Sequence, residues 1–319
     1  MTAISTAPEP TESAPEPYPP GDEITPGYRV IQHIRRGQEL DTYDAWSEKR
    51  YCRCFIKSVR PDLAHHEGVR ERLELEGRLL LSFTHPHIVR AYDLVGGEHG
   101  PVVVLETLSG ATLSHLVETR TRRLTAAELA HLGQHLCSAM AYMHDHGYLH
   151  LDLNPGNIIA DMGRARVIDL NFARQPGPSR GGAGTPCAMS PEQIRGGMLS
   201  QETDVWGIGL VLYGAATGIQ PFDVGTSGER RDTIVLDEPT NFESESVSAL
   251  QARCPQLTVP APPIRTQRRL PKAMSTAIDA CLRQDPQQRP TVAELAEALS
   301  AVADPVPTPG AESSRPVHR

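Results

Sequence analysis

The segment His150-Leu-Asp-Leu-Asn-Pro-Gly-Asn157 decides how this sequence is interpreted. It follows a stretch with helical periodicity, and the apolar pair Ile158-Ile159 comes directly after it. Twelve residues beyond Asn157 lies Asp169, at the end of Val167-Ile-Asp169. Two carboxylates and an amide in this order suit magnesium–nucleotide chemistry, in which one carboxylate orients a hydroxyl and the other groups hold the metal. Taken alone, the segment also fits a polar turn followed by a short hairpin.

Around this segment the chain changes from strand-rich to helix-rich. Strand-like runs and one helical stretch come first: Tyr28–Ile34, Tyr43–Trp46, Arg53–Lys57, the helix Glu67–Leu81, then Ile88–Leu94 and Val102–Leu105. After Gly110 helical periodicity dominates, at residues 125–145, 204–217, 271–283 and 291–301. A β-rich first third followed by an α-rich remainder predicts an α+β fold with two lobes.

Proline marks the two ends of the chain. Seven of the 28 prolines lie in the first 26 residues, where Glu, Ser and Thr are also frequent and no apolar periodicity exists. We therefore expect disordered tails at residues 1–26 and 304–319, around one domain at 27–303. Its N-lobe is expected at 27–108 and its C-lobe at 109–303, with a polar insertion at about 224–258.

Charge and hydropathy exclude several classes of protein. The formal net charge is −8 and no basic stripe is present, so nucleic acid is not expected as a partner. No apolar run has the length of a membrane span, and the N-terminus lacks the pattern of a secretory signal. The six cysteines form no C-x-x-C pair, as is usual for reduced thiols. These features predict a cytoplasmic protein.

At this point the sequence resembles the bacterial, eukaryotic-type (Hanks-type) Ser/Thr protein kinases, over roughly residues 28–303 and with divergent motifs. The segments that carry the resemblance are His150-Leu-Asp152 with Asn157, Asp169, Ile56-Lys57, Glu76 before His85-Pro-His-Ile-Val89, Gly184 to Glu192 ending in Ser190-Pro-Glu192, Asp204-Val-Trp-Gly-Ile-Gly209, and Asp285-Pro-Gln-Gln-Arg289. Each motif is weak alone, but their shared order and spacing make chance a poor explanation.

The resemblance implies roles for individual residues in phosphoryl transfer from ATP with Mg²⁺ to a protein substrate. Among the residues implied as catalytic, Asp152 would orient the substrate hydroxyl and Thr185 would bond to it, while Glu76 would orient Lys57 on the phosphates. Asn157 and Asp169 would hold Mg²⁺. The residues implied in cofactor binding are Gly37, Phe55, Lys57, Leu105 as gatekeeper, Glu106 and Leu108 of the hinge, and Asn154.

Several positions depart from the family pattern. Of the glycine-rich loop only Gly37 remains, and two acids, Glu39 and Asp41, stand nearby. Phe55 replaces the Ala of V-A-I-K, and Thr42 stands for the Val of the opposite wall. In the catalytic loop, Asn154 replaces a Lys.

A further departure concerns regulation. Leu151 replaces the Arg of H-R-D, and Ser179 is the one hydroxyl acceptor between Phe172 and Gly184. A phosphorylated activation loop therefore has no obvious cationic partner.

Three functional interpretations remain open from the sequence. The first is an active Ser/Thr protein kinase that is not gated by activation-loop phosphorylation, since Lys57, Glu76, Asp152, Asn157 and Asp169 are all present. The second is a pseudokinase that acts as a binding, scaffolding or nucleotide-sensing module, in view of the eroded glycine-rich loop. The third is a small-molecule kinase. The sequence does not determine the oligomeric state.

Overall fold

The structure, a computed structural model, describes residues 15–120, 122–181, 183–185, 187–222, 234–235 and 254–303. Most of the predicted insertion at 224–258 and the whole predicted tail at 304–319 lie outside these residues. The chain divides into two units: one holds the described residues up to Ser82 together with Arg90–Thr107, and the other holds Phe83–Val89 together with the chain from Leu108 onward. Each unit is described by itself.

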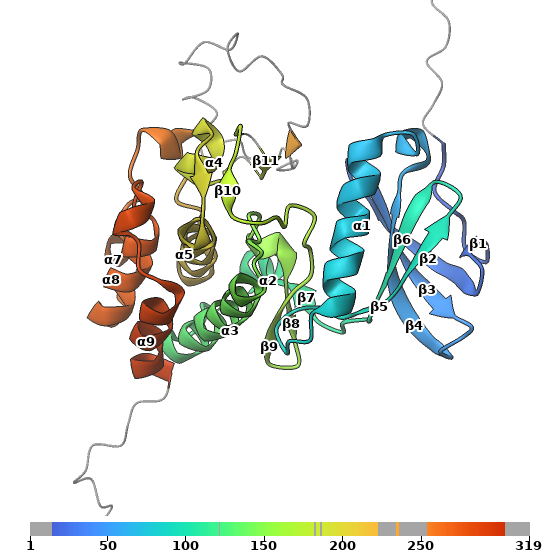
Figure 1. Ribbon diagram of the computed structural model, residues 1–319. Coiled ribbons are helices and arrows are strands. Elements are labelled where there is room, and N and C mark those ends of the chain that lie inside the picture. Colours follow the sequence, from blue (N-terminus) through green and yellow to red (C-terminus); the bar gives the residue numbers. More distant parts are fainter. Residues whose placement is uncertain are drawn as a thin grey trace, which may run out of the picture. The chain divides into compact units, whose positions relative to one another are not determined.

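The first unit is built on an antiparallel sheet with the strand order β1-β2-β3-β4-β6-β5. Its elements are β1 (Glu23–Thr25), β2 (Tyr28–Arg36), β3 (Leu40–Ser47), β4 (Cys52–Val59), the 3-10 turn η1 (Pro61–Leu63), α1 (Glu67–Ser82), β5 (Ala91–Gly97) and β6 (Gly100–Leu105). Helix α1 packs against β4, β5 and β6, as Figure 1 shows.

Alternation along the strands separates two faces of this sheet. Cys54 and Ile56 of β4 enter an apolar cluster with Tyr28, Tyr43 and other buried side chains of the sheet. Lys57 alternates with Ile56 and is buried as well. Strand β4 therefore places the charged side chain of Lys57 in a buried position, where it needs a partner of opposite charge.

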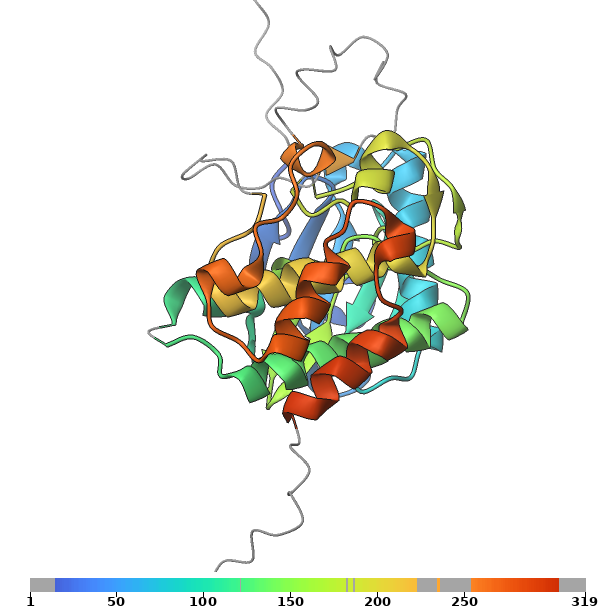
Figure 2. The same cartoon turned by 90° about the vertical axis from the view of Figure 1, so that its left-hand side faces the viewer.

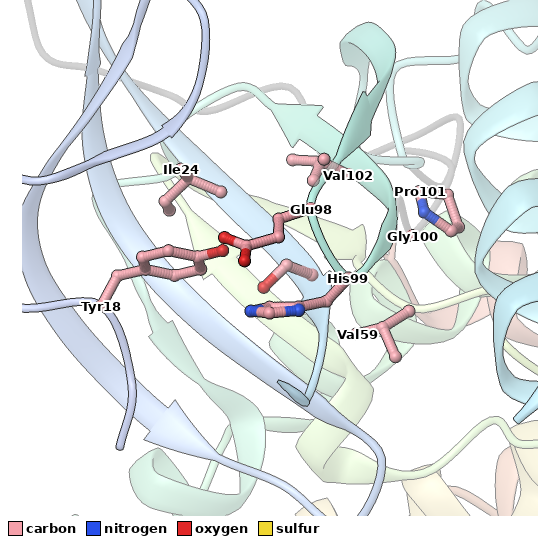
Figure 3. Close-up of a pocket in the computed structure, with 10 residues that line it drawn as sticks. Tyr18, Ile24, Val59, Glu98, His99, Gly100, Pro101 and Val102 are labelled. Atoms are coloured by element: carbon pink, nitrogen blue, oxygen red, sulfur yellow. The ribbon is translucent and has the colours of Figure 1, made fainter. Parts of the chain in front are cut away.

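The predicted tail at 1–26 is corrected for its last residues. Glu23–Thr25 form β1 on the edge of the sheet, and Ile24 is buried among core residues of β2 and β3. Upstream, the Tyr18 ring stacks on His99 at 5.8 Å. Figure 3 shows Tyr18, Glu98 and His99 gathered at one pocket of this unit. Composition alone missed this strand because it is three residues long and lies among prolines.

The second unit is mainly helical. Its elements are β7 (Ala111–Thr112), α2 (Leu113–Thr119), α3 (Ala126–Asp145), η2 (Pro155–Asn157), β8 (Ile158–Asp161), β9 (Arg164–Val167), β10 (Gly177–Pro178), β11 (Ala183–Gly184), α4 (Pro191–Arg195), β12 (Met198–Leu199), α5 (Gln201–Thr217), β13 (Ile234–Val235), η3 (Pro255–Leu257), α7 (Ile264–Gln267), α8 (Lys272–Cys281), η4 (Pro286–Gln288) and α9 (Val292–Ala303). Strands β7, β8 and β9 form a small antiparallel sheet.

Helix α5 is the centre of this unit. Nearly all of its residues are buried, as expected for a helix that is apolar on every side, and it ends at Gly218 with a left-handed φ of 81°. It packs against α3 and α8, and α9 lies alongside α3 (Figure 2, red and green). A capping box between Thr125 and Glu128 begins α3. None of the helices among the described residues is long and apolar enough to cross a membrane.

The residues 83–89 belong to the second unit, although the sequence predicts them in the N-lobe. The reason is backbone pairing: the amide of Val89 donates to the carbonyl of Val167, and the amide of Val167 donates to the carbonyl of His87. These bonds tie the segment to the end of β9.

Candidate functional site

In the first unit, Lys57 of β4 forms a buried ion pair with Glu76 of α1. The Nζ atom of Lys57 donates to Oε1 of Glu76 at 2.7 Å, and the side chains are 7% and 0% exposed. A buried carboxylate on a helix is costly unless a cation meets it, so the pair fixes the contact between α1 and the sheet at this point. The sequence predicted these two residues as partners on the resemblance alone.

The turn between β2 and β3, residues 37–39, stands where a glycine-rich loop is expected. The amide of Gly37 donates to the carbonyl of Leu40 at 2.8 Å, which closes a tight hairpin. The Arg60 guanidinium donates to the carbonyls of Gly37 and Gln38 at 3.1 and 2.8 Å. These carbonyls are therefore engaged within the protein.

Both acids near this turn are neutralised by cations. Asp41 is fully buried and accepts two hydrogen bonds from Arg36, at 3.0 and 2.8 Å, and a contact from His33 at 3.0 Å. Glu39 pairs with Arg72 of α1 at 2.5 Å. An unpaired carboxylate near a phosphate site would repel the phosphate, and pairing with a cation reduces that repulsion.

The register of β3 and β4 gives Phe55 and Lys57 polar cross-strand neighbours. Thr42 lies opposite Lys57, and Asp44 lies opposite Phe55. Asp44 forms an ion pair with Arg53 of the neighbouring strand. Phe55, which stands where the family has a small Ala, therefore has an acid as its direct cross-strand neighbour.

The residues predicted as gatekeeper and hinge lie at the end of β6 and directly after it. Leu105 ends that strand, is buried, and lies opposite both Phe55 and Ala91. The backbone amide of Glu106 donates to the carbonyl of Arg90 at 3.0 Å. Leu108 belongs to the second unit and is half-buried.

In the second unit, the Asp152 carboxylate accepts four hydrogen bonds. Oδ1 accepts from the backbone amide and the hydroxyl of Thr185, at 3.0 and 2.8 Å. Oδ2 accepts from the side-chain amides of Asn157 and Asn154, at 2.9 and 3.2 Å. The structure thus brings together Asp152, Asn154, Asn157 and Thr185, which are all predicted site residues. Four donors hold the carboxylate in one orientation.

Burial raises the pKa of Asp152 to about 7, and the neighbouring carboxylate of Asp169 adds to the rise. The hydrogen bonds from Thr185 and Asn157 oppose it, because they stabilise the charged form. A carboxylate whose pKa approaches neutrality is suited to accept a proton from a hydroxyl.

Asp204 holds the backbone at the start of the segment His150–Asn157. Its two carboxylate oxygens accept from the amides of His150 and Leu151 at 2.9 and 2.8 Å, and His144 contacts Oδ2 at 2.8 Å. Gln193 donates to the carbonyl of Leu151 at 2.7 Å. Leu151 has a φ of 66°, which costs energy for a non-glycine residue. These contacts on both sides hold it there.

Sequence reasoning gave no site role to Asp204 or Gln193. The signal for Asp204 was present, since an acid in the first turn of an otherwise apolar helix needs a polar partner. Its partners are backbone amides, which every non-proline residue has, so the sequence does not indicate which of them Asp204 binds.

Asn157 and Asp169 supply oxygen ligands of the type that Mg²⁺ prefers. Because Nδ2 of Asn157 donates to the carbonyl and to Oδ2 of Asp152, the other amide atom, Oδ1, is the one with lone pairs for a cation. The Oδ1 atom of Asp169 accepts from the amide of Asn171 at 2.9 Å, which fixes the turn after β9. A carboxylate and an amide oxygen fit the metal implied by the resemblance.

Leu151, at the position where an Arg is expected, packs in an apolar cluster. It is 7% exposed and contacts Leu149 and Leu199, with Phe172 against the same cluster. This site has apolar side chains where the family has a cationic one. Ser179 lies beyond β10, and its hydroxyl accepts from the amide of Gly181.

The segment that ends at Glu192 is anchored to the helical core. Ser190 caps α4 through a capping box with Gln193, and Pro191 is the first helical residue. The Glu192 carboxylate accepts from Arg289 at 2.7 and 2.8 Å. Burial alone would raise the pKa of Glu192, but the Arg289 guanidinium outweighs it and lowers the pKa.

Known proteins match this chain over most of its length. A model of the protein kinase domain matches residues 28–299. The serine/threonine-protein kinase PkaA of Streptomyces coelicolor is 31% identical over 263 residues, covering 78% of this chain and 43% of that protein. The serine/threonine-protein kinase PrkC of Bacillus subtilis is 30% identical over 237 residues, covering 72% of this chain and 35% of that protein. The chain therefore spans less than half the length of these relatives.

Solved structures show the same fold. The kinase domain of PknI from Mycobacterium tuberculosis superposes with a TM-score of 0.68 over 91% of this chain and 100% of that one, at 18% identity. That likeness establishes the two-lobed α+β fold that the sequence predicted. Together with the match over residues 28–299 and the relatives among bacterial Ser/Thr kinases, it shows that the chain belongs to the protein kinase domain family.

Proposed function

We propose that this chain transfers a phosphoryl group from ATP, with Mg²⁺, to a serine or threonine hydroxyl of a protein substrate. The observation that carries the proposal is the Asp152 carboxylate, which four donors from Thr185, Asn154 and Asn157 hold in one orientation. The names of the relatives as serine/threonine-protein kinases support the substrate class.

In this mechanism Asp152 orients the substrate hydroxyl and accepts its proton as the oxygen bonds to phosphorus. Its raised pKa, about 7, makes it a better base than an exposed carboxylate. Because four donors already engage the carboxylate, one of them must yield when the hydroxyl binds. The two hydrogen bonds to Oδ2, from the Asn154 and Asn157 amides at 3.2 and 2.9 Å, are on average longer than the two to Oδ1, at 3.0 and 2.8 Å. We therefore expect one of the bonds to Oδ2 to break.

Lys57 provides the positive charge for the phosphates, and Glu76 holds its ammonium in place. Asn157 and Asp169 hold the metal, which neutralises charge that develops on the phosphoryl oxygens. Arginine in the place of Lys57 would not be equivalent, since a planar fork cannot replace a compact point charge.

The activity we propose is not gated by phosphorylation of the activation segment. Gating of that kind needs a cation that meets the phosphate. At the expected position the chain has Leu151, buried with Leu149, Leu199 and Phe172. An apolar cluster offers nothing to a phosphoserine.

A pseudokinase is the second candidate, and two observations favour it. The β2–β3 turn has its carbonyls bonded to Arg60 and lacks the glycines that bring backbone amides to a phosphate. Phe55 replaces the small Ala of the family, and the Asp44–Arg53 ion pair lies opposite it on the sheet. Both changes act on nucleotide binding and leave Asp152 intact.

The test measures binding and transfer separately. We expect Mg²⁺-ATP to raise the melting temperature, and γ-phosphate to reach a generic basic protein or the chain itself. Asp152→Asn should abolish transfer while the thermal shift persists, and Asp145→Asn, an exposed acid at the end of α3, is the matched control. A thermal shift without Asp152-dependent transfer establishes the pseudokinase. Transfer to small molecules only overturns the protein-kinase proposal.

A further inference from the structure

A second ion pair lies on the same helix as Glu76, one turn before it. Arg72 and Glu76 are four residues apart in α1, so their side chains lie on one face of the helix. Glu76 meets Lys57 of β4, and Arg72 meets Glu39 of the β2–β3 turn at 2.5 Å. Two successive turns of α1 are thus tied to the β2–β3 turn and to β4.

The Glu39–Arg72 pair is not an ordinary surface pair. The two side chains are 15% and 16% exposed, whereas those of Glu74 and Arg78, an ion pair on the same helix, are 47% and 63% exposed. Exposed pairs contribute little because water screens them, and a pair with this degree of burial is screened less. The Glu39–Arg72 pair therefore holds α1 against the β2–β3 turn, whereas the Glu74–Arg78 pair joins two residues of α1 itself.

The turn that carries Glu39 is itself held from a third direction. Arg60 donates to the carbonyls of Gly37 and Gln38, and its own backbone amide donates to the carbonyl of Glu39 at 3.0 Å. The guanidinium of Arg60 is in turn held by Asp62 at 3.0 and 2.5 Å. These bonds restrict movement of the turn that carries Glu39, so Glu39 can hold α1 in place through Arg72.

We infer that Glu39 and Arg72 are positioning residues for Lys57. Their ion pair fixes the turn of α1 that precedes Glu76 and keeps the Glu76 carboxylate directed at the Lys57 ammonium without any modification of the activation segment. The β2–β3 turn stands where the family has a glycine-rich loop over the phosphates, and here it serves as a brace on α1. For catalysis this inference rests on the proposed function, while the position of Lys57 can be measured without it.

The chain offers an internal assay, because its three lysines are Lys49, Lys57 and Lys272. Lys49 and Lys272 are exposed, and Lys57 is buried in its ion pair. Limited acetylation of the full chain with acetic anhydride, read by peptide mass spectrometry, gives the reactivity of each lysine. Normalising Lys57 to the two exposed lysines corrects for reagent and protein concentration.

We expect Glu39→Gln to raise the relative acetylation rate of Lys57 about threefold to tenfold, the range that loss of a partly buried ion pair produces. The rates of Lys49 and Lys272 should stay the same. The matched control Glu74→Gln should leave all three rates unchanged. The exchange variant carrying Glu39→Arg and Arg72→Glu should restore the protection of Lys57, which a merely structural role for either residue would not predict.

In steady-state kinetics, the change should appear in kcat and not in KM. Glu39→Gln should lower kcat about tenfold and leave the KM for the protein substrate unchanged, since the pair acts on Lys57 and not on the substrate. If Glu39→Gln does not fold, Arg72→Lys, which keeps the charge and loses the fork, serves in its place with a smaller rise in acetylation.

The outcomes separate the inference from the proposed function. Wild-type protection of Lys57 in Glu39→Gln, with the protein folded by circular dichroism, overturns the positioning role whatever the activity. Absence of phosphoryl transfer in the wild type overturns the proposed function, and the acetylation rates still decide the positioning role.

Discussion

Glu192 and Arg289 are separated by 97 residues in the chain and form a two-pronged ion pair at 2.7 and 2.8 Å, with the Arg289 side chain fully buried. The Arg289 guanidinium also lies over the Trp206 ring, 5.0 Å from its centre. This ion pair ties the segment that ends at Glu192 to the helical core.

Replacing Arg289 with Met should destabilise the second unit strongly. The change leaves the Glu192 carboxylate without its cation, and breaking a buried pair in this way costs about 3–5 kcal/mol. The unfolding free energy from urea titration measures the effect. Arg265→Met, at an exposed arginine of α7, should change it by less than about 0.5 kcal/mol. A loss in Arg289→Met as small as in the control would contradict the assigned role.

Replacing Lys57 with Met should remove phosphoryl transfer. The ammonium is the positive charge we assign to the phosphates, and loss of a preorganised charge of this kind lowers kcat about 100-fold or more. Initial rates of γ-phosphate transfer give the result. Lys49→Met is the matched control, because Lys49 is exposed in the turn before β4 and should have no effect on the rate. Equal rates in both variants would show that the phosphate site lies elsewhere.

Removing the hydroxyl at Ser179 should leave the transfer rate unchanged. The apolar cluster around Leu151 provides no cation for a phosphate at this segment. Ser179→Ala and phosphatase-treated wild type should therefore match the untreated protein within about twofold, far from the tenfold that 1.4 kcal/mol represents. A tenfold fall after phosphatase treatment would show that the chain is gated after all.

Shortening Ile24 to Ala should destabilise the first unit by about 2–4 kcal/mol, because the side chain is 4% exposed among core residues. Thermal or urea unfolding, followed by the fluorescence of Trp46 in β3, measures the change. Ile31→Ala is the comparison, since Ile31 is 40% exposed on the neighbouring strand and should cost little. Equal effects would mean that β1 contributes nothing to this core.

Acid should destabilise the second unit through its stacked histidines. His87 and His135 stack at 4.0 Å, and burial lowers the pKa of His135 to about 4 and also lowers that of His87. The charged groups that face His135 are His87, His131 and Arg164, all of which further oppose its protonation.

The sign of the effect follows from linkage. An unfolded histidine has a pKa near 6.5, so between about pH 6.5 and 4 the unfolded state binds more protons and stability falls as the pH falls. The melting temperature should drop over this window and less so in His135→Gln, which keeps an acceptor for the Ala165 amide. His115→Gln, at an exposed histidine of α2, should follow the wild type.

Much of this molecule could be predicted from the order of its residues. Periodicity gave the helices α1, α3, α5, α8 and α9 and the strands β2 to β6 to within a few residues, because each element buries one face and its apolar spacing records that face. Residue type and spacing predicted metal–nucleotide chemistry for Asp152, Asn157 and Asp169, and the resemblance to protein kinases added Lys57 and Glu76. Of these residues, Asp152 and Asn157 lie in one short segment of the sequence.

The tertiary structure decided what no local pattern carries. Asp204 binds two backbone amides, and Arg72 pairs with Glu39. Neither contact has a sequence signature, because a backbone amide is the same at every non-proline residue and an arginine has many acids within reach. The pairing of Asp44 with Phe55 depended on strand register, in which a shift of one residue exchanges the two faces. Sequence determined which groups this protein has, and only folding determined which of them meet, since contacts between distant residues depend on the packing of the whole chain.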